Sequence, residues 1–118
     1  MRNVLVAACM IAVLAAPAAF AAPGVSSVVT VSAAKNGLMY STKTLHARAG
    51  RIEIVFRNPS ALRHNVRIEL GEKELGGTAT IAHGTTKAFV TLKRGVYHFY
   101  CSVPGHEDAG MSGSLHVS

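Results

Sequence analysis

Residues 97–111 constrain the chain more than any other stretch, because an aromatic extended segment runs there into three regularly spaced sulfur and nitrogen side chains. Cys101, His106 and Met111 follow one another at intervals of five residues, in the pattern Cys-x4-His-x4-Met. A thiolate, an imidazole and a weak thioether are the ligand types that hold copper in electron-transfer sites. The spacing therefore predicts that this loop supplies three ligands to one copper ion.

The residues around these side chains suit a metal site. Two-residue alternation along a strand places Tyr97, Phe99 and Cys101 on one face, so we expect the thiol to point inward beside an aromatic layer. Gly105 and Gly110 allow the backbone angles that return the loop over the sulfur. Cys101 is also the only cysteine outside a predicted N-terminal leader, and a lone thiol in an exported protein calls for an explanation. Metal ligation supplies one.

A copper site of this type needs a second imidazole, and His64 is the best candidate. We expect a strand over 64–70, in which Val66, Ile68 and Leu70 share one apolar face. His64 continues that face if it belongs to the regular strand. A single imidazole on an apolar face is usually a hydrogen-bonded core histidine, so it is the later ligand loop that makes His64 a candidate ligand.

These motifs together resemble those of a known family. They are Phe99-Tyr100-Cys101, Pro104-Gly105-His106 and Gly110-Met111-x-Gly113, with His64-Asn65-Val66 upstream. In this combination the chain resembles the cupredoxins, the small type I blue copper proteins of the plastocyanin and azurin kind. The spacing around the loop histidine is closest to the rusticyanin and sulfocyanin branch, whereas the short chain is more like plastocyanin. The resemblance covers residues 28–118.

The resemblance implies a fold, a cofactor and a set of roles. It implies a Greek-key β-sandwich with one copper ion between the sheets at one end, cycling between Cu(I) and Cu(II). His64, Cys101 and His106 would lie in a trigonal plane, with Met111 as a long axial contact. The residue after the upstream histidine commonly ties the two ligand segments together in this family. Asn65 matches that position, and Ser102 is its candidate partner, although a simple polar loop residue is an equal reading of Ser102.

Short strands separated by glycine turns give the fold class independently. The expected strands cover 25–32, 38–40, 44–48, 51–57, 64–70, 85–92, 96–101 and 114–118, and the glycine-rich residues 71–77 are expected to form a loop or a short helical turn. No helical periodicity occurs after residue 21. Seven or eight strands of this kind predict an all-β antiparallel sandwich.

The first 21 residues are expected to be a secretory signal peptide. Arg2 provides a positive start, residues 4–14 are almost wholly apolar, and Ala19-Phe20-Ala21 provides small residues for cleavage. The apolar run is shorter than the roughly 20 residues that span a membrane. Residues 22–118 would then form one exported, periplasmic domain that is not transmembrane.

Charge and context limit the function classes. The chain has 12 Lys and Arg against 6 Asp and Glu, spread without the aromatic interleaving of a nucleic-acid site. We expect a monomeric electron carrier with transient redox partners of the cytochrome or oxidase type, steered by charge if they are acidic. A copper storage or delivery module is the alternative, since the same ligands would serve it. An enzyme is not expected, because Tyr100 and Ser102, not histidines, flank Cys101.

The remaining histidines lack a ligand context. His46, His83, His98 and His116 are expected to be solvated, although a second weak metal site among them stays open. Around the loop histidine, we expect a partly apolar exposed patch that docks partners. Its predicted members are Leu62, Val103 and Ala109, beside Pro104-Gly105-His106.

Overall fold

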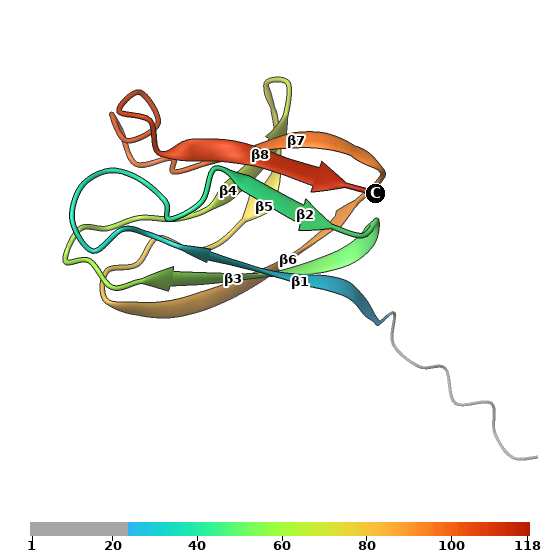
Figure 1. Cartoon of the computed structure of the whole chain (residues 1–118), viewed down its shortest axis with the longest axis horizontal. Coiled ribbons are helices and arrows are strands. Elements are labelled where there is room, and N and C mark those ends of the chain that lie inside the picture. The colour runs from blue at the N-terminus through green and yellow to red at the C-terminus, as the bar shows by residue number, and fades with distance from the viewer. Residues whose placement is uncertain (1–23) are drawn as a thin grey trace, which may run out of the picture.

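The computed structural model describes residues 24–118, and the predicted signal peptide lies outside them. Eight strands form a two-layer sandwich (Figure 1). The strands are β1 (Val25–Ser32), β2 (Thr44–Ala47), β3 (Gly50–Asn58), β4 (Arg67–Leu70), β5 (Lys73–Gly77), β6 (Gly84–Leu92), β7 (Gly95–Tyr100) and β8 (Ser112–Val117). Residues 24–118 contain no helix, so the predicted all-β class is confirmed.

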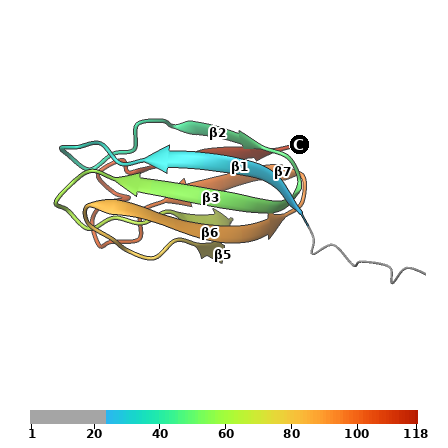
Figure 2. The same ribbon diagram turned by 90° about the horizontal axis from the view of Figure 1, so that it is seen from below.

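The two sheets have different sizes. Strands β1, β3 and β6 form a three-stranded sheet in that order (Figure 2), and the other sheet has the order β2-β8-β7-β4-β5. Strand β1 runs parallel to β3 and β2 runs parallel to β8, whereas the other pairs are antiparallel. The expected purely antiparallel sandwich is therefore wrong in two pairings, because residues 33–43 carry the chain from one sheet to the other.

Alternating apolar side chains fill the space between the sheets. Ile52, Ile54 and Phe56 on β3 are at most 1% exposed, as their two-residue spacing predicts. Phe99 on β7 and Leu115 on β8 face them from the other sheet and are fully buried. Each such side chain contributes roughly 1.5–3 kcal/mol through its burial. This core supports the strand ends at which the candidate ligands lie.

The structure corrects the expectation for residues 71–77. They form most of a hairpin, in which β5 pairs with β4 across a turn at Gly71. Glycines usually weaken a strand, which is why the segment reads as a loop. Gly77 belongs there because a Cβ atom would overlap the carbonyl oxygen of Val66. Leu70 lies beside the hairpin turn and is 54% exposed, so it does not share the buried face of Ile68 as predicted.

Two other predicted strands are shorter than expected. Strand β4 begins at Arg67, and His64 lies before it in an isolated bridge to Ile81. Of residues 38–40, only Tyr40 pairs, in an isolated bridge to Ala33. Both segments are fixed by tertiary contacts instead of a regular ladder.

Within residues 24–118, no helix has the length and apolar character that a membrane span requires.

Candidate metal centre

The register of the larger sheet brings the predicted ligand segments to one end of the sandwich. Tyr100, the last residue of β7, pairs with Arg67 on β4 and with Ser112 on β8. The His64 segment directly precedes Arg67, Cys101 directly follows Tyr100, and Met111 directly precedes Ser112. Figure 1 shows the loops of this end together, opposite the C-terminus.

Three predicted side chains converge in this region. The Sγ atom of Cys101 lies 3.5 Å from Nδ1 of His106 and 3.9 Å from Nδ1 of His64, and the two Nδ1 atoms are 3.1 Å apart. Cys101 and His64 are both fully buried, whereas His106 is partly exposed. The same three residues form a cluster whose ligand atoms all lie within 4.8 Å of one another.

This donor set fits a single soft or borderline ion. An ion in a trigonal plane with nitrogen at about 2.0 Å and sulfur at about 2.3 Å separates its ligand atoms by roughly 3.5–3.7 Å. The three observed separations bracket those values. Two imidazoles and one thiol, mostly shielded from water, are the donors that copper and zinc accept, and not those of magnesium or calcium.

Met111 is held against the same loop through its backbone. Its N–H donates to the His106 carbonyl at 3.1 Å, and its carbonyl accepts from the Cys101 N–H at 3.1 Å. The side chain is fully buried in the core cluster. The backbone thus joins all three loop residues that the spacing singled out.

A series of tight turns shapes the loop between Cys101 and Met111. The His106 N–H donates to the carbonyl of Val103 at 3.0 Å, and the Gly110 N–H donates to that of Glu107 at 2.8 Å. Gly105 and Gly110 have φ angles of 83° and 104°, which side-chain-bearing residues rarely adopt. The glycines therefore meet the turn requirement expected of them.

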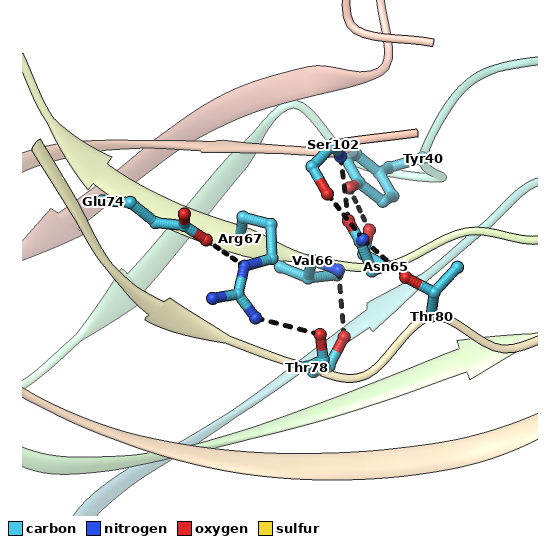
Figure 3. Close-up of polar contacts among 8 residues, drawn as sticks. All are labelled: Tyr40, Asn65, Val66, Arg67, Glu74, Thr78, Thr80 and Ser102. Atoms are coloured by element: carbon cyan, nitrogen blue, oxygen red, sulfur yellow. Dashed lines mark hydrogen bonds and ion pairs between the residues drawn. The ribbon is translucent and has the colours of Figure 1, made fainter. Parts of the chain in front are cut away.

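Asn65 and Ser102 contact each other as predicted (Figure 3). The Asn65 Nδ2 group donates to Ser102 Oγ at 2.8 Å, and the Ser102 N–H donates back to Asn65 Oδ1 at 2.9 Å. Asn65 Nδ2 also donates to Thr80 Oγ1 at 2.9 Å, and Asn65 is only 3% exposed. One amide thus links the residue after His64 to the residue after Cys101.

The surroundings of His64 favour its neutral form. Burial lowers the pKa of His64 below its ordinary value, and the neighbouring His106 lowers it further. A neutral imidazole leaves one ring nitrogen free to bind a metal. The other, Nε2, is buried and has no hydrogen-bond partner among the described residues.

Two residues that the sequence analysis missed support the same region. Tyr40 donates its hydroxyl to the Asn65 carbonyl at 2.6 Å, and its ring packs against Phe99 with a centroid separation of 5.3 Å. Burial, with the nearby Cys101 as a second cause, raises the pKa of Tyr40, so the phenol keeps its proton. Lys43 donates from Nζ to the Gly110 carbonyl at 2.5 Å. Neither residue type signals this role in a sequence.

The other histidines lie outside the cluster. His46 and His116 are exposed cross-strand neighbours whose rings stack 5.3 Å apart, and exposed His83 precedes Gly84 in a turn, all as expected. The expectation is incomplete for His98. Its Nε2 atom lies 2.9 Å from Glu107 and 4.0 Å from Glu69, so it is ion-paired when protonated.

The predicted exposed patch is present in part. Leu62 is 47% exposed and Ala109 is also exposed. Val103 is partly buried and packs against the core, so it contributes less to the surface than expected. Pro104 and Gly105 are exposed beside the partly exposed His106.

A Greek-key β-sandwich with a buried cysteine between two histidines at one end defines the cupredoxin class. The sequence agrees with this, since the model of the family described as "Copper binding proteins, plastocyanin/azurin family" matches residues 27–118. The chain therefore belongs to the plastocyanin/azurin family of copper-binding proteins, and its cofactor is a single copper ion.

Solved structures show the same fold at low sequence identity. Dithionite-reduced auracyanin from Roseiflexus castenholzii superposes with a TM-score of 0.72 at 22% identity, over 80% of this chain and 99% of that one. Auracyanin A from Chloroflexus aurantiacus, described as a "blue" copper protein, superposes with a TM-score of 0.67 at 20% identity, over 77% of this chain and 98% of that one. Reduced rusticyanin superposes with a TM-score of 0.64 at 20% identity, over 80% of this chain and 81% of that one. No curated protein sequence matches the chain.

Proposed function

We propose that the protein is a type I copper electron carrier, in which His64, Cys101, His106 and Met111 hold the ion. The observation that carries this proposal is the convergence of Cys101 Sγ with the Nδ1 atoms of His64 and His106, at separations of 3.1–3.9 Å. When bound, copper supplies a reversible one-electron change between Cu(I) and Cu(II). The reduced and oxidised states named for related structures of rusticyanin and amicyanin are consistent with this chemistry.

The chain contributes rigidity, shielding and access. Cys101 and His64 are inaccessible to solvent, so a thiolate at Cys101 would be protected from oxidants and from thiol partners. Asn65 and Ser102 hold the two ligand segments together, which limits rearrangement when the charge at the site changes. His106 is the partly exposed candidate ligand and therefore offers an electron route to the surface.

The same proposal covers processing, location and partners. Cleavage after Ala21 would release residues 22–118 as one domain into a periplasm or a similar exported compartment. There it would act as a monomer that meets redox partners transiently, through the exposed surface around Leu62, His106 and Ala109. The full chain has a formal charge of +6, which becomes +5 when Arg2 is removed, and this positive charge favours acidic partners of the cytochrome or oxidase type. The protein would transfer electrons without catalysing a reaction of its own.

Optical and EPR spectra of copper-loaded residues 22–118 test the assignment. The wild-type protein should show an intense visible band from sulfur-to-copper charge transfer, and Cys101→Ser should abolish it. His116→Gln is the matched control, since it removes an exposed imidazole far along β8 and should leave the band unchanged. A wild-type protein without the band, or a Cys101→Ser variant that retains it, would contradict the proposal.

The partial exposure of His106 also suits a protein that loads and releases copper. Voltammetry separates this second candidate from the first. A carrier gives a reversible one-electron wave and retains copper in both states. A storage or delivery module loses the ion on reduction, which dialysis and metal analysis would show.

A further inference from the structure

We propose that residues 40–43 form a positioning element for the copper site. The side chains of Tyr40 and Lys43 bind the backbone beside His64 and beside Met111, two segments far apart in the sequence. We call these residues the Tyr40–Lys43 segment. The inference rests on the ligands proposed above, but the contacts themselves exist without any metal. They would therefore shape the site before copper binds.

The Tyr40 side chain acts on the His64 side. Its hydroxyl donates to the Asn65 carbonyl at 2.6 Å, and Figure 3 shows it meeting the residue that also binds Ser102. Tyr40 is 4% exposed, and its ring lies against Phe99 and Phe56 at centroid separations of 5.3 and 6.3 Å. The ring is thus fixed by the core, so the hydroxyl has little freedom to leave the carbonyl.

The Lys43 side chain acts on the other side, on the peptide group that joins Gly110 to Met111. The carbonyl of this peptide accepts from the Lys43 ammonium at 2.5 Å, and its N–H donates to the His106 carbonyl at 3.1 Å. A charged donor on the carbonyl polarises the peptide and strengthens the bond that its N–H makes. Lys43 would thereby fix the position from which Met111 approaches the site.

The Tyr40–Lys43 segment is itself anchored to both sheets. Ser41 donates its N–H to the carbonyl of Ser32, at the end of β1, at 2.8 Å. The Lys43 carbonyl accepts from the N–H of Ser114 on β8, also at 2.8 Å. Gly113 lies so close that a Cβ atom there would overlap that carbonyl. The segment can therefore transmit the fixed spacing of the sheets to the two ligand segments.

Amide hydrogen exchange in the copper-free protein tests both contacts. Lys43→Met should accelerate exchange at the Met111 amide, and Tyr40→Phe should do so at the His64 and Ser102 amides. We expect about tenfold in each case, since a lost hydrogen bond of this kind weakens local protection by about 1.4 kcal/mol. The acceleration is counted only in excess of that at β3 amides, which report the change in global stability.

Matched variants remove the same groups elsewhere. Tyr97→Phe removes a hydroxyl that donates to the Lys93 carbonyl at 2.7 Å, at the opposite end of β7. Lys35→Met removes an ammonium that makes no hydrogen bond to the ligand loop within the described residues. Neither control should accelerate exchange at His64, Ser102 or Met111. If the Tyr40 and Lys43 variants accelerate these amides no more than those of β3, the proposal is overturned.

Copper-loaded protein supplies the second readout. Lys43→Met should change the ratio of the visible bands and the EPR splitting, and should lower the reduction potential more than Lys35→Met, because a nearby cation disfavours Cu(II). Unchanged spectra and equal potentials for the two lysine variants would overturn the role at the metal. Failure of the copper assignment itself would appear separately, as a wild-type protein without the charge-transfer band, and the exchange data would still decide whether the segment shapes the apo site.

Discussion

The two candidate histidine ligands are held in opposite ways. His64 pairs with Ile81 through both its N–H and its carbonyl, at 3.0 and 2.9 Å, and is fully buried. Val66 is likewise bonded to Thr78 on both sides: its N–H donates to the Thr78 hydroxyl (Figure 3), and its carbonyl accepts from the Thr78 N–H. His106 instead lies in a loop of consecutive turns and is partly exposed.

The difference assigns separate tasks to the two sides of the site. The His64 side is fully buried, so it excludes water and would hold its candidate ligand atom in place. The His106 side is partly exposed, and in the proposed carrier its ring would be the group through which an electron reaches a partner. A site open on both sides would admit water and oxidants to Cys101, whereas a site closed on both sides would couple poorly to other proteins. The asymmetry therefore suits a carrier.

Removing each imidazole in turn gives the largest expected contrast. His106→Gly should lose the visible band and recover most of it when free imidazole is added, because the emptied position opens to solvent. His64→Gly should lose the band and recover little, because its position is sealed. Titration with imidazole, followed by absorption, measures both. Equal recovery in the two variants would mean that the buried and exposed sides do not differ in access.

Glycine replacements probe how tightly each segment is packed. Gly77→Ala should destabilise the protein by about 3 kcal/mol, since a Cβ atom would overlap the Val66 carbonyl and φ is 149°. Gly105→Ala should cost only about 1 kcal/mol, from its positive φ alone, because nothing lies within 4 Å. Urea unfolding of the copper-free variants measures the two values. If Gly105→Ala lost more stability than Gly77→Ala, the His106 loop would be the more tightly packed segment, which contradicts the comparison.

The Asn65 side chain links the His64 segment to the Cys101 segment. Its removal should lower the stability of the fold somewhat less than Gly77→Ala does. Asn65→Ala removes the partner of the Ser102 N–H and of the Thr80 hydroxyl, two part-buried hydrogen bonds, at a cost of about 2 kcal/mol in the free energy of unfolding. Asn36→Ala, in an exposed turn, is the control and should stay within about 0.5 kcal/mol of wild type. The same urea titration decides. Equal small losses would show that this link does not stabilise the fold.

Acidification should give the smallest effect. Burial holds the pKa of His64 below its ordinary value, so the unfolded chain binds this proton more readily than the folded one. Copper-free protein should therefore lose stability as the pH falls from about 7.5 to about 5.5, through the ordinary histidine pKa. His64→Gln should reduce that loss, and the difference between the two pH profiles isolates this residue. Parallel profiles would argue against a shifted His64.

Local sequence was enough to predict the ligand loop, but not how the buried His64 segment is held. Cys101, His106 and Met111 stand close together in the chain, and strand alternation correctly predicts that Cys101 faces inward. The burial of His64 was predicted from a regular strand that does not extend that far. Its actual partner, Ile81, lies beyond β5, and no local pattern encodes such an isolated bridge.

Side chains that bind backbone leave even less trace. Tyr40 and Lys43 donate to carbonyl groups, which every residue carries, so no complementary residue type marks their targets. The hairpin at residues 71–77 was missed for a related reason. Gly77 is required by the closeness of Val66, a tertiary constraint, whereas sequence reasoning assigns glycine to turns.

The position of β7 in its sheet has a consequence for how long the protein would retain a metal. Strands β8, β7 and β4 are interior, and β2 and β5 are the edges. The sulfur-bearing residue follows the middle strand, and the other predicted ligand segments adjoin its two neighbours. Fraying of either edge would thus leave this three-strand unit paired, so loss of an edge strand would not by itself separate the predicted ligand segments.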